Sequence, residues 1–253
     1  MTTTTTDSAA PGPAAAPQAL PFLGSSRTSF TVHAALALAL LATLNWMIAA
    51  HAPESVKQIG SSYLIVYYHV PSAILSYLAY FGVFLCGIFH LVTNAPEWDR
   101  RARASAAIGL LATGVVVVTG AVWGKAAWNV WWRFDDPRLT TSAVLFLIYL
   151  AYIVLARGIE DETKRSRTCA IYGIAAFLAV PLVHFSIQWF GQGSHPPKVA
   201  MAEPGIRDTL NMGIFAFLAL YSLLYRWKFD LDSVRERADA ALQRIRRLED
   251  LRS

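Results

Sequence analysis

Residues 105–123 read S-A-A-I-G-L-L-A-T-G-V-V-V-V-T-G-A-V-W, without one charged side chain. As an α-helix this stretch would rise about 28 Å, close to the roughly 30 Å hydrocarbon thickness of a bilayer. Glycines recur in it at Gly109, Gly114 and Gly120, among small residues that favour close packing between membrane helices. The stretch is therefore predicted to be a transmembrane helix.

Windows of comparable length and apolarity lie on both sides of this stretch. Together the windows cover residues 30–50, 67–92, 105–123, 142–156, 168–187 and 209–225. The composition agrees, because 55% of the residues are hydrophobic, only 15% are charged, and the mean hydropathy is +0.39. We therefore predict an all-α integral membrane protein with six transmembrane helices.

Basic residues concentrate in alternate connections between these windows. They gather in residues 100–103, in residues 157–167 and after residue 226. The positive-inside rule places these connections, and with them both termini, in the cytoplasm. Connections near residues 51–66, 124–141 and 188–208 then face outward. The net charge of +5 follows this membrane pattern, so no nucleic-acid partner is predicted.

Composition also divides the chain along its length. Residues 1–29 are rich in Thr, Ala and Pro and are predicted to be a disordered cytoplasmic lead. Residues 30–226 hold the six windows, and residues 227–253 form a cytoplasmic amphipathic helical tail. The capping-box pattern Ser233–Glu236 predicts where that tail helix starts. Its heptad-like apolar stripe fits either a solvated helix with a weak packing face or a coiled-coil partner site.

The segment Val122–Thr141 reads V-W-G-K-A-A-W-N-V-W-W-R-F-D-D-P-R-L-T-T and holds four of the chain's eight tryptophans. It is too polar to span a bilayer and too aromatic for an ordinary loop. Interfacial tryptophans usually anchor a helix end, which is one interpretation of Trp123. Trp128, Trp131 and Trp132 are instead predicted to form a surface shelf for a flat apolar ligand.

Histidines flank this tryptophan segment in the sequence. His69 precedes Pro71 at the predicted outer mouth of the second span, where a structural hydrogen-bonding role is an equal alternative to ligation. His195 lies in an outer loop and His184 near the outer end of the fifth window. Two imidazoles beside apolar rings suit haem, whose iron takes axial ligands on both faces. Arg or Lys side chains could pair with its propionates.

Other chemistry finds little support in the sequence. The two cysteines, Cys86 and Cys169, form no C-x-x-C or C-x-x-C-H motif, so covalent haem attachment is not predicted. Motifs of hydrolases, metalloproteases and phosphate-binding loops are also missing from the sequence. A binding protein is therefore predicted rather than an enzyme.

Three motifs together resemble one known family. Residues 123–140, W-G-K-A-A-W-N-V-W-W-R-F-D-D-P-R-L-T, resemble the WWD signature of a haem-handling family in bacterial cytochrome c maturation. Residues 67–73, Y-Y-H-V-P-S-A, are similar to the family's first histidine motif. Residues 184–190, H-F-S-I-Q-W-F, with the histidine beyond them, are similar to the second. The resemblance covers roughly residues 60–225 and is strongest to the six-span CcmC members.

The resemblance implies non-covalent haem b, held in transit at the outer face of the bacterial inner membrane. It implies His69 and His195 as the axial ligands, with His184 as the alternative to His195. The implied haem contacts are Trp123, Trp128, Trp131, Trp132, Asp135, Asp136 and Arg138. The implied partners are a periplasmic haem chaperone (CcmE), an ABC-type transporter pair (CcmA and CcmB) and a small membrane subunit (CcmD), beside membrane lipid.

The sequence departs from the family pattern at two places. Phe134 stands where the family usually has a tryptophan, and D-D-P-R contains one extra residue, so either Asp135 or Asp136 can be the signature's acid. One extra residue also separates Trp189 and Phe190 from His195.

Two other classes of membrane protein compete with haem delivery. A transporter subunit needs a polar path at mid-depth, and the windows carry almost no charge there. A b-type electron-transfer cytochrome usually seats its histidines within the spans. Both alternatives are therefore disfavoured.

Overall fold

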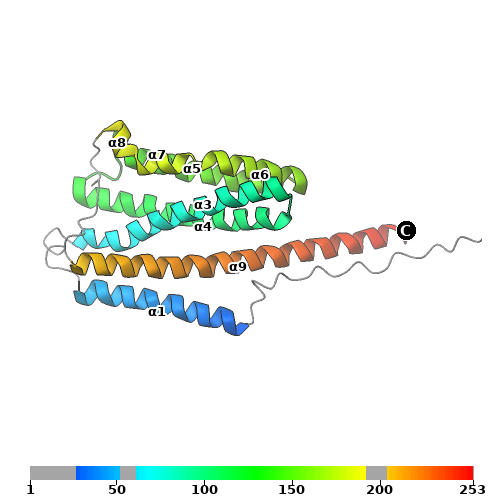
Figure 1. Cartoon of the computed structure of the whole chain (residues 1–253), viewed down its shortest axis with the longest axis horizontal. Coiled ribbons are helices and arrows are strands. Elements are labelled where there is room, and N and C mark those ends of the chain that lie inside the picture. Colours follow the sequence, from blue (N-terminus) through cyan, green and yellow to red (C-terminus); the bar gives the residue numbers. More distant parts are fainter. Residues whose placement is uncertain (1–26, 52–60, 192–203, 253) are drawn as a thin grey trace, which may run out of the picture.

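The computed structural model describes residues 27–51, 61–191 and 204–252 (Figure 1). Every regular element within these ranges is a helix. In chain order they are α1 (Arg27–His51), the 3₁₀ turn η1 (Ser61–Ile65), α3 (Val66–Thr93), α4 (Pro96–Trp128), α5 (Pro137–Gly158), α6 (Glu162–Ala176), α7 (Ala179–His184), α8 (Ser186–Phe190) and α9 (Pro204–Asp250).

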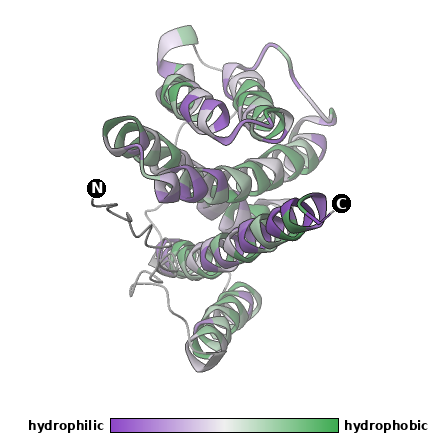
Figure 2. Ribbon diagram, turned by 90° about the vertical axis from the view of Figure 1, so that its right-hand side faces the viewer, coloured by the Kyte–Doolittle hydropathy of each residue, from purple (hydrophilic) through white to green (hydrophobic). Residues whose placement is uncertain are grey.

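Six helical segments of the described residues are long and apolar enough to cross a membrane. They are residues 28–50, 62–93, 96–128, 137–158, 162–184 and 205–250. Figure 2 looks along the bundle: hydrophobic residues dominate the lengths of the helices, and hydrophilic residues gather at the end nearest the viewer. The prediction of a six-span, all-α membrane protein is confirmed. The cytoplasmic placement of the termini stays a prediction.

Two apolar clusters hold the bundle together. The larger one contains residues from α3, α4, α5, α6 and α7, and it includes the fully buried Tyr80, Tyr149 and Tyr152. Rings of Tyr80 and Tyr149 stack with centroids 3.4 Å apart. The smaller cluster joins α1, α3 and α9 around Leu44 and Leu210. Helix α9 therefore lies between α1 and the rest of the bundle, as Figure 1 shows.

Short connections divide the bundle into two chemically different ends. We call one the basic end: it holds the α3–α4 turn at residues 94–95 and the α5–α6 turn at residues 159–161. We call the other the tryptophan end: it holds the α4–α5 connection at residues 129–136, together with α8 and the starts of α3 and α9 (left in Figure 1). Antiparallel neighbours thus bring alternate connections to the same end.

The fifth predicted span is not one continuous helix. Sequence predicted residues 168–187, whereas the chain is helical from Glu162 to Ala176 and then resumes as α7 and α8. Pro181 explains the interruption, because it has no N–H to donate to the carbonyl four residues earlier, at Phe177. That carbonyl accepts instead from the backbone N–H of Val180 at 3.0 Å.

The capping-box pattern predicted that a new helix starts at Ser233, and this prediction is wrong. Helix α9 runs unbroken from Pro204 to Asp250, and the Ser233 hydroxyl donates to the Phe229 carbonyl at 2.8 Å. A helix of that length rises about 70 Å, more than twice the hydrocarbon thickness, so it must continue outside the membrane. Figure 1 shows it extending beyond the other helices. The division at residues 226 and 227 stays a prediction, as does the predicted lead, most of which lies outside the described residues.

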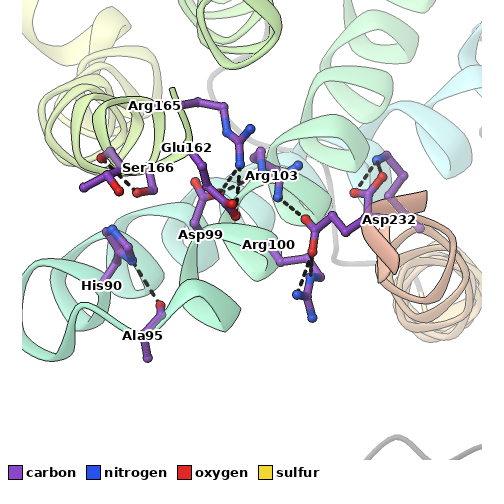
Figure 3. A network of polar contacts seen from close by, with 12 residues as sticks. His90, Ala95, Asp99, Arg100, Arg103, Glu162, Arg165, Ser166 and Asp232 are labelled. Atoms are coloured by element: carbon purple, nitrogen blue, oxygen red, sulfur yellow. Dashed lines mark hydrogen bonds and ion pairs between the residues drawn. The ribbon is translucent and has the colours of Figure 1, made fainter. Parts of the chain in front are cut away.

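Ion pairs tie three helices together at the basic end (Figure 3). Asp99 on α4 is only 4% exposed; its Oδ2 accepts from Arg103 Nε at 3.0 Å and lies 3.7 Å from Arg165 Nη2 of α6. Arg103 also donates to Glu236 of α9 at 2.8 Å, and Arg100 Nη2 lies 2.7 Å from the other oxygen of Glu236. These contacts hold the extended part of α9 against the bundle.

Candidate functional site

The tryptophan segment is partly helical. Sequence predicted an outward connection over residues 124–141, but α4 continues to Trp128 and α5 already begins at Pro137. Trp123 and Trp128 therefore both lie on the last turns of α4, with ring centroids 4.9 Å apart in an edge-to-face arrangement. A Cβ built on Gly124 would lie 3.3 Å from the Trp128 ring, so that ring packs back onto its own helix.

Helix α4 ends after Trp128 for a local reason. Asn129 has φ 59, a left-handed conformation in which asparagine is favoured among non-glycine residues. Its backbone N–H donates to the Lys125 carbonyl at 3.1 Å, and Lys125 Nζ returns a hydrogen bond to the Asn129 carbonyl at 3.0 Å. The chain therefore turns sharply before Trp131 and Trp132.

The connection at residues 129–136 presents large apolar side chains outward. Trp131 is 60% exposed and Phe134 is 83% exposed, while Trp132 is half-buried. Phe134, the departure from the family's tryptophan, is thus the most exposed ring of the segment. The predicted shelf residues are therefore divided: Trp128 is the last residue of α4, whereas Trp131 and Trp132 lie in the connection that follows.

The two adjacent aspartates have different structural roles. Asp136 is 1% exposed and caps α5, where its Oδ1 accepts from the backbone N–H groups of Arg138 at 3.0 Å and Leu139 at 3.1 Å. Pro137 follows at the first helical position, as is typical of helix starts. Asp135 is exposed and pairs with Arg133 at 2.7 Å, and this hydrogen bond holds the pKa of Asp135 below its ordinary value.

His69 is the fourth residue of α3, and its side chain packs against α4. Its Nδ1 is 2.8 Å from the hydroxyl of Thr119, and a Cβ built on Gly120 would lie 3.4 Å from its Cε1. Residues four apart in a helix lie on the same face, one turn from each other. Trp123 is four residues after Thr119 and therefore lies on the same face of α4, one turn nearer its end. The imidazole is thus seated one turn from the Trp123–Trp128 ring pair.

A proline two residues after His69 shapes the start of α3. Pro71 cannot donate to the Tyr67 carbonyl, and α9 approaches that carbonyl closely. A Cβ built on Gly213 would lie 2.9 Å from the Tyr67 oxygen and 3.0 Å from Pro71 Cγ. Glycine at this position therefore lets α9 pack directly against the turn that carries His69.

Arg138 connects the tryptophan segment to the end of α7. Its Nη2 donates to the His184 carbonyl at 3.3 Å. The exposed His184 ring meets Tyr77 edge-on at a centroid distance of 6.2 Å, and Phe185 stacks on Trp189 at 5.5 Å. A second group of exposed rings thus lies at the tryptophan end, from the end of α7 to α8.

The predicted ligand pair is only partly described. His69 lies within the described residues, whereas His195 lies outside them. Among the described residues, no group of three or more His, Cys, Asp or Glu side chains gathers as a metal site. The choice between His184 and His195 stays a prediction.

Thr119 was missed by the sequence analysis, although the sequence carried a signal for it. In a helical hairpin, residues equally far from the turn lie at the same height. His69 precedes Asn94 by 25 residues, and Gly120 follows Ala95 by 25 residues. A short turn at residues 94–95 therefore predicts that His69 meets α4 near Thr119 and Gly120.

Fold and site together define a multi-pass helical membrane protein with a histidine and an exposed aromatic surface at one end. Comparison with known proteins is more specific. The family model CcmC, Heme exporter protein C, matches residues 14–248. The chain therefore belongs to the CcmC family.

Individual relatives match most of the chain. "Heme exporter protein C" of Escherichia coli (strain K12) is 32% identical over 194 residues, which cover 75% of this chain and 78% of that protein. The protein of the same name from Haemophilus influenzae is 33% identical over 195 residues, with the same coverage. A "Putative cytochrome c biosynthesis ccmC-like mitochondrial protein" of Marchantia polymorpha is 30% identical over 173 residues, covering 68% and 72% of the two chains.

Proposed function

We propose that this protein binds haem at the outer face of the bacterial inner membrane and delivers it to a periplasmic haem chaperone for cytochrome c biogenesis. The haem is non-covalent haem b, carried as cargo. Family membership supports this proposal, because the relatives from Escherichia coli and Haemophilus influenzae are named heme exporters. The protein acts by binding and release and performs no enzymatic step.

The main observation behind the proposal is the position of the His69 side chain against α4. Its imidazole contacts Thr119 and Gly120 on α4, one turn from the pair Trp123 and Trp128. An axial ligand for haem must lie beside a surface that can cover the macrocycle, because most of the binding free energy comes from the apolar area removed from water. The His69 imidazole at the start of α3 and the aromatic rings at the end of the neighbouring α4 meet that requirement.

The other proposed contacts follow from the chemistry of haem. Trp128, Trp131 and Trp132 form the shelf for the macrocycle, together with Trp123. Arg138 is in reach of the same end and offers a guanidinium, which suits a propionate. Asp136 contributes indirectly, because it caps the helix turn that carries Arg138. Asp135 contributes through its pair with Arg133. His195 is the proposed second axial ligand.

Delivery is proposed to occur by ligand exchange. Two histidines hold the iron, and a residue of the receiving chaperone displaces one of them. The proposed receiver is CcmE, and the proposed membrane partners are the transporter pair CcmA and CcmB and the small subunit CcmD. Exposed rings at the tryptophan end, such as Trp131 and Phe134, leave one side of the shelf accessible to a partner.

An absorbance spectrum of the purified full-length protein tests the haem proposal. The protein is expressed with haem supply and extracted in mild detergent, and a Soret band is expected. His69→Ala and His195→Ala should each reduce the band, and the double variant should abolish it. His184→Ala tests the alternative ligand.

The matched control is His33→Ala, which removes a histidine of α1 that contacts Ser222 of α9 at 2.8 Å. This variant should keep the wild-type band. A wild-type protein without any Soret band would refute haem binding. A band that survives the double variant unchanged would instead refute the ligand assignment and reopen the b-type cytochrome.

A further inference from the structure

We infer that Thr119 is a positioning residue for His69: it fixes the imidazole tautomer in which Nε2, not Nδ1, carries the lone pair for iron. This inference rests on the proposed function, because it concerns the histidine proposed to ligate haem. It assigns a role to a residue outside all three sequence motifs. The geometry around one hydroxyl group carries it.

The Thr119 hydroxyl has two close partners. Its Oγ1 lies 2.6 Å from the Val115 carbonyl oxygen, which is four residues earlier on α4, and 2.8 Å from His69 Nδ1. The Val116 carbonyl is farther away, at 3.3 Å. A threonine hydroxyl owns one proton and can accept two hydrogen bonds. The two close contacts therefore cannot both receive that proton.

The carbonyl decides where the proton lies. A carbonyl oxygen can only accept, so a separation of 2.6 Å requires the Thr119 proton to point at Val115. His69 Nδ1 must then be the donor in its contact with Thr119. A neutral imidazole has one protonated nitrogen and one acceptor nitrogen, and Nε2 is left as the acceptor. Thr119 thus selects one of the two tautomers of His69.

This arrangement matches what a haem-ligating histidine requires. A hydrogen bond from the non-ligating N–H fixes the ring orientation and raises the basicity of the ligating nitrogen. The acceptor here is itself polarised, because it donates to a helix carbonyl. The close approach of Gly120 to His69 Cε1 keeps the ring against α4. Both contacts come from one rigid helix, which supports a fixed ring position before any ligand arrives.

The tautomer can be measured in the wild-type protein without haem. In haem-free wild-type protein labelled with ¹⁵N-histidine, the His69 resonances, assigned with His69→Ala, should show a protonated Nδ1 and an unprotonated Nε2. The opposite tautomer, or a mixture near that of free histidine, would overturn the inference.

Variants of Thr119 test the consequence for haem. Thr119→Val removes the acceptor at nearly constant shape. Haem retention on dilution should fall at least about tenfold, as it does when the hydrogen-bond partner of a metal-ligating histidine is removed. The haem reduction potential should rise, because a less basic imidazole stabilises ferric iron less. Thr119→Ser keeps the hydroxyl and should restore both values toward wild type.

Thr43→Val is the matched control. The Thr43 hydroxyl also donates a hydrogen bond to a carbonyl of its own helix, that of Ala39 on α1, at 2.9 Å. It should change neither value. Wild-type retention and potential in Thr119→Val, alongside loss of the Soret band in His69→Ala, would overturn the role of Thr119 and leave the proposed function standing. Full retention in His69→Ala would instead overturn the assignment of His69 as an axial ligand, and a wild-type protein without a Soret band would overturn the proposed function itself.

Discussion

The two ends of the bundle use their polar and aromatic residues in opposite ways. At the basic end, polar side chains pair between helices: Arg103 of α4 pairs with Glu236 of α9, and the buried Asp99 of α4 faces Arg165 of α6. At the tryptophan end, the ion pair Arg133–Asp135 stays within one connection, and large rings such as Trp131 and Phe134 are exposed.

This difference separates an end that holds the helices together from the end proposed to bind haem. Ion pairs between helices satisfy each other and leave little surface for a ligand. Exposed aromatics gain free energy only when something covers them. The basic end therefore holds the helices in place, and the tryptophan end is the surface that remains to be covered. Four sets of substitutions test that division, in order of their expected effect on the free energy of unfolding, and a pH dependence accompanies the third.

Asp99→Ala should have the largest effect on stability. It removes the buried carboxylate between Arg103 and Arg165 and leaves their charges less compensated. Breaking a buried ion pair of this kind costs about 3 kcal/mol. Thermal unfolding in detergent should show the loss, while the Soret band per folded molecule should stay unchanged. Glu97→Ala, in the same helix turn, is the control and should cost much less. An Asp99→Ala variant as stable as wild type would contradict a clamping role for this end.

Asp136→Ala should rank second. Losing the N-cap of α5 costs about 1 kcal/mol, and Asp136→Asn should recover most of it because asparagine caps nearly as well. Asp135→Ala should change the free energy of unfolding much less, since its ion pair is exposed to solvent. The same unfolding assay distinguishes the two aspartates. Equal losses in both variants would show that capping is not what separates them.

Glu236→Gln should have a smaller effect, confined to α9. It weakens the pairs with Arg100 and Arg103 by at most about 1 kcal/mol, which raises the population of released tail up to about fivefold. A spin label at Ala240→Cys should become more mobile. Glu249→Gln, far along the same helix, should leave the label's mobility unchanged. No change in Glu236→Gln would indicate that the tail is held by other contacts.

The same pair predicts a pH dependence. Burial would raise the pKa of Glu236, but hydrogen bonds from Arg103 and Arg100 outweigh it and hold that pKa below its ordinary value. The stabilisation is therefore complete above the unfolded pKa of about 4.3 and is lost as the pH falls through the lower folded value. The spin label should stay restricted at pH 7 and at pH 5. Release already at pH 6 would contradict this assignment.

Trp131→Ala should have the smallest effect on stability and a clear effect on haem. The side chain is 60% exposed, so unfolding should change by no more than about 0.5 kcal/mol, whereas haem retention should fall. Trp46→Ala is a close control, because Trp46 of α1 is also 60% exposed. It should leave retention unchanged. Equal behaviour of the two variants would mean that Trp131 is an ordinary interfacial anchor.

Much of the fold was predictable because a bilayer imposes a simple rule. A helix that crosses it must be apolar over a fixed length, so windows such as residues 105–123 identify spans without tertiary information. Helix ends were harder to predict. The Asp136-Pro137 pair is a typical helix start, yet the tryptophans around it favoured a long loop in the sequence analysis. The apparent capping box at Ser233 does not start a helix, because α9 continues through it and the Ser233 hydroxyl donates to the Phe229 carbonyl.

The candidate site divides along the same line. By itself, the sequence determined the six apolar spans, the tryptophan segment and the histidine motifs, since these depend on residue type and local spacing. Only the tertiary structure decided that His69 meets Thr119 and that Glu236 holds α9. The reason is physical: each of these roles depends on which atoms of another helix or turn come within hydrogen-bonding distance. Packing alone determines that distance.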